Sequence, residues 1–502
     1  MMPALLSGVL LFLSFPSFGH PAFAWIALVP LLLTTLAARS WQLALFRGLT
    51  TGAIHFVGTI YWIPRVVEDF GGLSFVASWS VSLLLVGYLA LFPGFFALAL
   101  WLLHRDFGTV AVFCAPILWV TTELGRIYLF TGFPWELLGY SQASVLPVAQ
   151  LASVVGVLGV SVLVVLVNAS FAFIVRTGRA RSIGVMLATA GLMAAVFLFG
   201  TVRLRSGTLI DLGVPLRVAA VQGNIAQVDK WNPELSDAIL DKYLKLTDRA
   251  ADAGADLVVW PEAATPFAFQ VDPRSEMIRR LARERNVHLL LGTTDVTWED
   301  APKYYNAAIL VDPRGETAGI YHKQHLVPFG EYVPLRRLLS FVSPLVESVG
   351  VFSAGEEPVM LMMDGQPIGA IVCYEMIYPG LVRQFVRNGS RLLTTVTNDA
   401  WYGRTAAPHQ HFQQATMRAI EHGRYVVRAA NTGISGVIDP YGRVVSETNL
   451  FEDDVLTSEV KLIQELTPYA RYGDLLAFGC GIFTLVLLSM AVASNMRAAR
   501  SQ

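Results

Sequence analysis

The segment IGAIVCYEMIYPG, residues 368–380, combines an apolar run with polar residues of the kind that a strand end presents. Its first half is rich in β-branched residues, which is typical of a buried strand. Cys373 ends the run, Glu375 follows two residues later, and a Pro-Gly pair then breaks the pattern. A cysteine in such a run is more often a core residue than a nucleophile. The rest of the sequence has to decide between packing and chemistry.

The residues around this segment, from 204 to 472, alternate between strand-like and helix-like patterns. Buried-strand patterns occur in LRVAAVQGNI (216–225), ADLVVWPEAA (255–264), NVHLLLGTTDV, YYNAAILVDPRG, PIGAIVCYE and RLLTTVTNDAW. Helical spacing occupies 233–253 and 409–424, and ISGVIDPYGRVV predicts a hairpin. We therefore expect an α/β domain that is soluble by itself.

The sequence on either side of this domain has a different character. The chain of 502 residues is 54% hydrophobic and only 15% charged, whereas soluble proteins carry roughly a quarter charged residues. Apolar runs, most of them near the ~20 residues that cross a bilayer, lie at 3–18, 22–38, 43–64, 75–103, 109–130, 148–175, 182–202 and 475–493. We expect a membrane domain with seven transmembrane helices (1–203), the α/β domain (204–472), and an eighth helix with a short tail (473–502).

Basic residues in the short loops predict the orientation. With the N-terminus in the cytoplasm, the cytoplasmic side holds Arg39, Arg47, Arg105, Arg176, Arg179, Arg181, Arg497 and Arg500. The short loops on the other side hold only Arg65 and Arg126. An odd number of preceding helices then places the α/β domain outside the cytoplasm. A net charge of −1 gives no basic field for nucleic acid, and three cysteines give no disulfide framework.

Chemically capable residues occur at three strand-to-loop junctions of the α/β domain. VVWPEAATP presents Glu262, YHKQHLVPFGEYVP presents Lys323 and Glu331, and IVCYEMIYP presents Cys373. A carboxylate that accepts the thiol proton and an ammonium that stabilises an oxyanion are what a thiol needs to attack a carbonyl. Each residue alone has an ordinary structural explanation, as a turn acid, a surface charge or a core cysteine. Their joint occurrence at strand ends favours catalysis.

These motifs resemble the Glu, Lys and Cys motifs of the nitrilase superfamily, which implies an α-β-β-α sandwich. The extended HLVPFGEYVP, the loop FTGFPWELLGYSQ (130–142) and the seven-plus-one arrangement of helices resemble its membrane branch, apolipoprotein N-acyltransferase. The resemblance implies that Glu262 is the general base, Lys323 the oxyanion-stabilising lysine and Cys373 the nucleophile. It also implies supporting or substrate-binding roles for further residues: Glu331, Tyr374, Glu375 and, in a looser local match, Trp231.

The resemblance further implies a two-step acyl transfer. A membrane phospholipid would donate an acyl chain to the cysteine as a thioester, and the α-amine of a diacylglyceryl-cysteine apolipoprotein would accept it. The enzyme would be a multi-pass protein of the bacterial inner membrane, with a periplasmic catalytic domain, cytoplasmic termini, no nucleic-acid partner, and no metal or organic cofactor. Two alternatives remain at this stage. One is a membrane-anchored amidase with water as the acyl acceptor, and the other is a transport or scaffold protein with an inert nitrilase-like domain.

Some residues invite other hypotheses. His409 and His411 are two positions apart and do not share a helix face as zinc ligands would, so we interpret them as polar residues at a helix start. Trp135 and Tyr140 have two open roles, as interfacial anchors or as lipid-binding residues. Glu123 and Arg126 are interpreted as interfacial or site-approach residues. The apolar stretch 335–352 is predicted to form a mobile, membrane-facing arm.

Overall fold

The computed structural model describes residues 1–16, 18–298, 301–332 and 352–500, and the chain divides into two compact units. The first, the helical unit, contains residues 1–64, 74–206 and 472–502. The second, the α/β unit, contains residues 65–73 and 207–471. The predicted arm at 335–352 lies, except for its last residue, outside the described residues.

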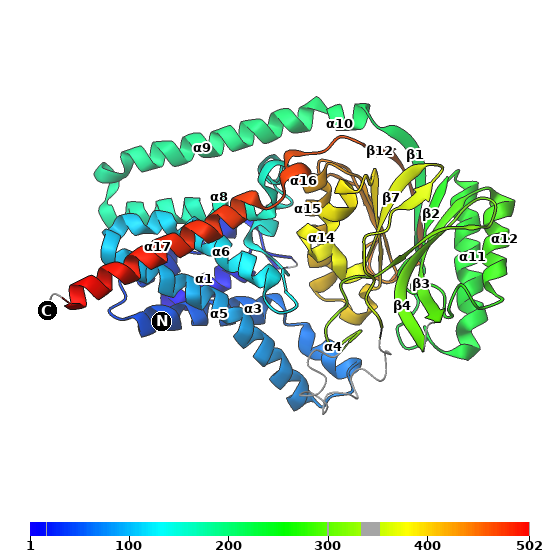
Figure 1. Cartoon of the computed structure of the whole chain (residues 1–502), viewed down its shortest axis with the longest axis horizontal. Helices are drawn as coiled ribbons and strands as arrows, with labels where there is room; N and C mark the ends of the chain where they lie inside the picture. The colour runs from blue at the N-terminus through cyan, green and yellow to red at the C-terminus, as the bar shows by residue number, and fades with distance from the viewer. Residues whose placement is uncertain (17, 299–300, 333–351, 501–502) are drawn as a thin grey trace. The chain divides into compact units, whose positions relative to one another are not determined.

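The helical unit is built from apolar helices (Figure 1). They are α1 (Met2–Phe12), α2 (Val29–Leu36), α3 (Trp41–Thr59), α4 (Ile63–Asp69, at the boundary with the other unit), α5 (Phe75–Phe107), α6 (Ala115–Tyr128), α7 (Leu146–Ala149), α8 (Ala152–Thr177), α9 (Arg179–Ser206) and α17 (Leu475–Arg500). By length and composition, four stretches of the described chain could cross a bilayer, or five if the bent pair α3–α4 is one span, whereas the sequence predicted eight.

The first two predicted spans are shorter than expected. Helix α1 has 11 residues and α2 has 8. Pro21 begins a separate 3-10 helix and Pro30 lies in the first turn of α2, because proline is accepted at a helix start but breaks a helix interior. The apolar runs at 3–18 and 22–38 are therefore interrupted, although their composition is that of a membrane segment.

Helices α5 and α6 form an antiparallel pair within the apolar stretch 75–128. The chain turns at Gly108, whose φ of +63° is unfavourable for residues with a side chain. The rings of Phe96 and Trp119 lie 5.1 Å apart, and the Tyr88 hydroxyl lies 3.4 Å from the carbonyl of Leu129. The later of the two contacts in the second helix (at 129 rather than 119) is made by the earlier residue of α5 (88 rather than 96), so the two helices run in opposite directions.

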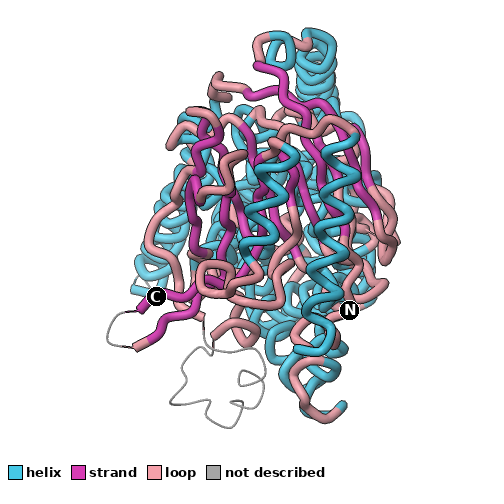
Figure 2. The backbone as a smooth tube through the Cα atoms, turned by 90° about the vertical axis from the view of Figure 1, so that its right-hand side faces the viewer, coloured by secondary structure: helices cyan, strands magenta, loops and turns pink. Residues whose placement is uncertain are grey.

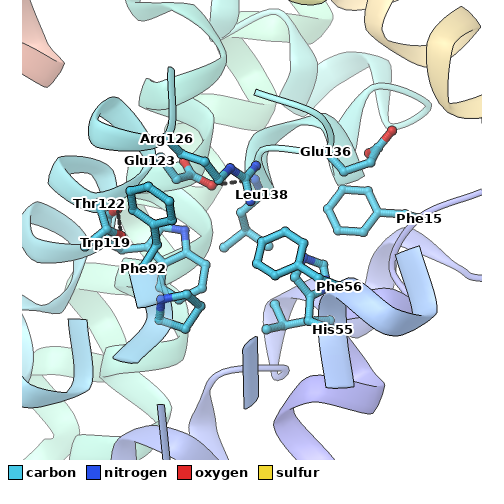
Figure 3. Close-up of a pocket in the computed structure, with 12 residues that line it drawn as sticks. Phe15, His55, Phe56, Phe92, Trp119, Thr122, Glu123, Arg126, Glu136 and Leu138 are labelled. Carbon is cyan, nitrogen blue, oxygen red and sulfur yellow. Dashed lines mark hydrogen bonds between the residues drawn. The ribbon is translucent and has the colours of Figure 1, made fainter. Parts of the chain in front are cut away.

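A buried polar cluster fastens the loop after α6 to the helical unit (Figure 3). Glu123 Oε1 accepts a hydrogen bond from the Leu138 N–H at 2.7 Å, and Arg126 Nη2 donates to the Trp135 carbonyl at 3.0 Å. Both charged side chains line a small pocket with Phe15, His55, Phe56 and Glu136. Glu123 and Arg126 are 4% exposed, so of their two predicted roles, interfacial or site-approach, burial contradicts the first and leaves the second untested.

The loop's aromatic residues are also buried. Trp135 is 1% exposed and Tyr140 is fully buried within the same unit. Of their two open roles, burial contradicts the interfacial anchor, since an anchor needs its polar tip at the water boundary, and the lipid-binding role stays untested. These rings pack instead; Trp135, for example, contacts Trp62 at a ring distance of 5.2 Å.

The α/β unit contains two six-stranded sheets. The first has the order β12-β1-β2-β3-β4-β5, with strands Asp454–Leu462, Val214–Gln222, Leu257–Val259, His288–Trp298, Pro302–Val311 and Thr317–His322. The second has the order β11-β10-β9-β8-β7-β6, with strands Val444–Glu447, Gly436–Ile438, Val426–Ala430, Leu392–Thr397, Gln366–Val372 and Leu361–Met363. The principal helices are α11 (Ser236–Asp252), α12 (Ser275–Arg285), α14 (Pro379–Arg387), α15 (Ala407–His422) and the short α10 (Thr208–Asp211) and α16 (Pro468–Tyr472).

Alternate residues of the first sheet pack into two different cores, which establishes the layers. Val218 and Ala220 of β1 pack with residues of the second sheet, whereas Ala219 and Val221 pack with residues of α11 and α12. This alternation follows from the two-residue period of a strand. Figure 2 shows α11 and α12 in front of the strands, and residues of α14 and α15 join the core that contains the second sheet. The predicted α-β-β-α sandwich is confirmed.

Candidate active site

Cys373 lies at a sharp turn directly after β7. Its φ is +51°, in the left-handed region that costs a non-glycine residue about 1–3 kcal/mol. The chain then enters a short 3-10 helix, Cys373–Ile377. The cysteine is 6% exposed, and its carbonyl lies 3.2 Å from Nε2 of His411. A strained backbone at a strand end, held by neighbouring side chains, is a common way to present a reactive side chain.

Glu262 follows β2 at the equivalent end of the other sheet. The next residue, Ala263, also has a positive φ of +46°. The backbone here lies so close to β3 that a Cβ on Gly292 would come within 2.5 Å of the Glu262 Cα. Gly292 is therefore the residue of β3 that allows the backbone at Glu262 to pack directly against this strand.

Lys323 lies between two carboxylates immediately after β5. Its Nζ is 2.9 Å from Glu331 Oε1 and 3.5 Å from Glu262 Oε1. Asn306 Nδ2 donates to both of these oxygens at 2.7 Å. Glu331 Oε2 also accepts from the Val327 N–H at 2.7 Å. The structure thus joins Glu262, Lys323 and Glu331 in one buried network, with Asn306 as a bridge that the sequence patterns did not indicate.

The charges in this network determine the resting state of the thiol. Burial by itself lowers the pKa of Lys323, but Glu331 and Glu262 raise that pKa above its usual value, so the lysine is charged. Burial raises the pKa of the Cys373 thiol, and Glu262 raises it further against the opposing effect of Lys323. Cys373 is therefore a thiol at neutral pH, and its reaction requires a base.

Glu375 joins the strand ends that carry Lys323 and Cys373. Its Oε1 accepts from the Tyr321 hydroxyl and the Gln324 N–H, each at 2.7 Å, and its Oε2 accepts from the Val372 N–H at 2.9 Å. These donors come from β5, the loop after it, and the last residue of β7. Glu375 is completely buried and connects the two sheets beside the cluster. Its geometry is that of a structural acceptor.

Tyr374 is buried next to Cys373, with its ring 5.4 Å from that of Tyr378 in an edge-to-face contact. Trp231 is different, because its side chain is 50% exposed and does not belong to the buried cluster. The preceding residue, Lys230, does: it is 2% exposed, and its Nζ donates to the Glu262 carbonyl at 2.7 Å. Burial lowers the pKa of Lys230 to about 8, against the raising effect of Glu262 and Cys373.

Sequence patterns missed three residues around the cluster: Lys230, Asn306 and His411. Lys230 stands next to a tryptophan in a loop, which resembles a surface position. Asn306 is a polar residue inside the buried strand pattern YYNAAILV, which was an available signal. His411 lies near the start of α15, as predicted, but it is fully buried, which the sequence pattern did not indicate.

The two-sheet sandwich and the family match of its residues define the α/β unit as a carbon-nitrogen-hydrolase-type domain. Residues 217–467 match the family model of carbon-nitrogen hydrolases, and residues 7–170 match that of the apolipoprotein N-acyltransferase N-terminal domain. The chain belongs to the apolipoprotein N-acyltransferase family.

Relatives over nearly the whole chain carry that family name. The apolipoprotein N-acyltransferase of Geobacter metallireducens is 42% identical, over 97% of this chain and 94% of that protein. Those of Methylococcus capsulatus and Pseudomonas aeruginosa are 36% and 37% identical, over 95% and 93% of this chain and 94% and 91% of theirs. Among solved structures, a mutant amidase of the nitrilase superfamily from Nesterenkonia is 23% identical with a TM-score of 0.39, over 51% of this chain and 93% of its own.

Proposed function

We propose that this protein transfers an acyl chain from a membrane phospholipid to the α-amine of a diacylglyceryl-cysteine apolipoprotein, through a thioester on Cys373. The observation that carries the proposal is that Glu375 ties the strand end of buried Cys373 to that of Lys323, whose Nζ lies 3.5 Å from Glu262, in a chain that also has an extensive apolar helical unit. Glu262 acts as the base, Lys323 stabilises the oxyanion, and Cys373 is the nucleophile. No cofactor takes part in this scheme.

In the first step the Cys373 sulfur attacks the ester carbonyl of the phospholipid while Glu262 accepts the thiol proton. The oxyanion that forms is stabilised by the charged Lys323. The carbon–oxygen bond then breaks, Glu262 returns the proton to the departing alkoxide, and a lysophospholipid leaves. The acyl chain remains on sulfur as a thioester.

In the second step the α-amine attacks the thioester and loses a proton to Glu262. The carbon–sulfur bond breaks, an amide forms, and the proton returns to the sulfur. A thioester suits this step because a thiolate is a much better leaving group than the alkoxide of the original ester. Burial favours the amine over water, since a water-filled site would hydrolyse the intermediate.

Supporting roles follow from the contacts. Glu331 shares Lys323 with Glu262 and so keeps the ammonium charged and in place. Glu375 sets the spacing between the Lys323 and Cys373 strand ends, and Tyr374 packs beside the nucleophile. Trp231, half exposed at the edge of this region, is assigned to substrate contact.

We place the enzyme in the bacterial inner membrane with a membrane domain at 1–203, a periplasmic catalytic domain at 204–472 and a C-terminal helix at 473–502. Eight passes and cytoplasmic termini agree with the arginine asymmetry and with the antiparallel α5–α6 pair. A reporter that is active only in the cytoplasm should be silent when it is fused within 204–472, and a signal there contradicts this topology.

A phospholipid labelled in its acyl chain tests the reaction. Acyl transfer to a lipopeptide amine is the expected outcome with purified full-length protein in detergent. Release of the label as free acid would instead identify a membrane-anchored amidase-type hydrolase, and absence of turnover would identify an inert domain. A thioester adduct on Cys373 that is labile to hydroxylamine and discharged by the lipopeptide is the expected intermediate.

A further inference from the structure

A positive φ at a non-glycine residue occurs at one reacting residue and directly after the other. Cys373 has a positive φ, and so does Ala263 directly after Glu262. Neither position is occupied by glycine, so both turns depend on outside contacts to hold their shape. In each case the carbonyl of the reacting residue is contacted by a buried basic side chain: Lys230 at Glu262 and His411 at Cys373.

Lys230 reaches Glu262 from the loop after β1. Its ammonium donates to the backbone carbonyl at 2.7 Å, while Asn306 and Lys323 approach the carboxylate Oε1. The lysine therefore holds the main chain of the base and leaves the carboxylate to the catalytic network. Glu262 and, when ionised, Cys373 raise the pKa of Lys230 against the effect of its burial.

His411 reaches Cys373 from α15 as the end of a buried chain of polar groups. Arg428 Nη2 lies 2.6 Å from Asp399 Oδ2 and 3.2 Å from His411 Nδ1, and His411 Nε2 lies 3.2 Å from the Cys373 carbonyl. All three of these side chains are 1% exposed or less. Asp399, one of these polar groups, lies shortly after β8. The residue before it, Asn398, contributes a backbone hydrogen bond to Cys373.

The proton on His411 can be assigned from its neighbours. Burial and the charge of Arg428 lower the pKa of His411, so the ring is neutral. The Cys373 carbonyl only accepts hydrogen bonds, and therefore Nε2 carries the single proton. Nδ1 lies 3.2 Å from Arg428 Nη2, which can donate to it, and 3.1 Å from Asp399 Oδ1, which can only accept. His411 therefore donates from Nε2 to the Cys373 carbonyl, while Arg428 and Asp399 hold the other side of the ring at Nδ1.

We infer that Lys230 and His411 are positioning residues that hold the backbones of the base and the nucleophile through their carbonyls. The inference rests on the proposed function. It assigns each residue to one reacting group, so that the carboxylate of Glu262 and the sulfur of Cys373 keep their alignment with Lys323. A displacement of about 1 Å in such an arrangement slows a reaction by roughly 10²-fold.

Substitutions of His411 separate positioning from simple packing. His411→Gln places an amide N–H near the position of Nε2 and retains the bond to the Cys373 carbonyl, whereas His411→Asn is too short to reach it. We expect His411→Gln to form the acyl adduct within threefold of the wild-type rate and His411→Asn to be at least tenfold slower. The matched control is His409→Ala, two residues earlier in α15 and partly exposed, which should react at the wild-type rate.

Lys230→Met tests the other carbonyl, with Lys245→Met as the control because Lys245 is exposed on α11. We expect Lys230→Met to lower kcat at least tenfold, with KM for the phospholipid changed by less than twofold. Each rate is divided by the fraction of protein whose Cys373 can be alkylated to completion, so that misfolded protein does not count. Normal kcat in Lys230→Met, or equal rates in His411→Gln and His411→Asn, would overturn the inference.

Alkylation with iodoacetamide distinguishes a failure of this inference from a failure of the proposed function. It needs no acyl donor, so it reports on the thiol even if the wild-type protein accepts no acyl chain. Loss of the Lys230 charge should slow initial alkylation of Cys373 at least threefold, because that charge favours the thiolate. A wild type that is alkylated but never acylated would reject the phospholipid reaction alone, whereas unchanged alkylation in Lys230→Met would reject an effect of Lys230 on the thiol and normal kcat would reject its role at the Glu262 carbonyl.

Discussion

Both units bury acids and bases, but they use them differently. In the helical unit, Glu123 accepts a backbone N–H and Arg126 donates to a backbone carbonyl, so the charges fasten a loop. In the α/β unit, Lys323 meets two carboxylates through their side chains, and its charge also acts on a thiol. Burial of charge alone is therefore a poor sign of catalysis. The better sign is that charged side chains face one another and a nucleophile.

Removal of the nucleophile of the α/β unit should cause the largest loss of acyl transfer. Cys373→Ala should lose acyl transfer by at least ~10⁴-fold, the scale seen when a nucleophile is deleted from covalent catalysis. Cys373→Ser should form at best a stable, slowly discharged ester. The measurement is the mass of the protein after incubation with phospholipid. An adduct on another residue, or acyl transfer by Cys373→Ala, would show that Cys373 is a packing residue and not the nucleophile.

Removal of the base should separate thiol acidity from catalysis. Glu262→Gln should slow acyl transfer by about 10²–10⁴-fold, the usual contribution of a general base. The Glu262 carboxylate raises the thiol pKa, so its neutralisation lowers that pKa and increases the thiolate fraction at a given pH. Alkylation of Cys373 between pH 7 and 9 should therefore become faster while acylation becomes slower. If both rates fall together, Glu262 does not influence the thiol as proposed.

A matched pair of cation deletions compares the two units directly. Lys323→Met should lower kcat by about 10²–10³-fold, because the oxyanion loses its principal stabilising charge. Arg126→Met should reduce the yield of folded protein, since the loop at 129–138 loses a buried contact. Its kcat per alkylatable site should stay within threefold of the wild type. A catalytic defect in folded Arg126→Met would show that the helical cluster also serves the reaction.

The smallest effect is expected for the second acid of the Lys323 network. Glu331→Gln keeps the shape of the side chain but removes the charge that faces Lys323 at 2.9 Å. We expect transfer to slow about tenfold, or ~1.4 kcal/mol in the barrier, with little change in the unfolding temperature. Wild-type turnover in this variant would make Glu331 a turn residue that only fastens the Val327 backbone.

The local sequence pattern by itself determined the α/β class and the strand-end positions of Glu262, Lys323 and Cys373, and the family motifs implied the sandwich. Those features depend on local patterns: an apolar run predicts a buried strand, and the residue after it stands at the edge of the sheet. The long apolar runs of α8, α9 and α17 were recognisable for the same reason. The family motifs added the assignment of roles, which local patterns do not provide.

Only the tertiary structure decided which side chains meet. Lys230 reaches Glu262 across 32 residues, Asn306 reaches Glu331 across 25, and His411 reaches Cys373 across 38. Burial is likewise a property of the whole fold, and it placed Trp135, Arg126 and His411 in the interior, which their local sequence does not indicate. It also made Cys373 a neutral thiol, because desolvation and Glu262 together outweigh Lys323. Local sequence specifies which groups are available, whereas their separation and their solvation, which determine their chemistry, depend on contacts between distant segments.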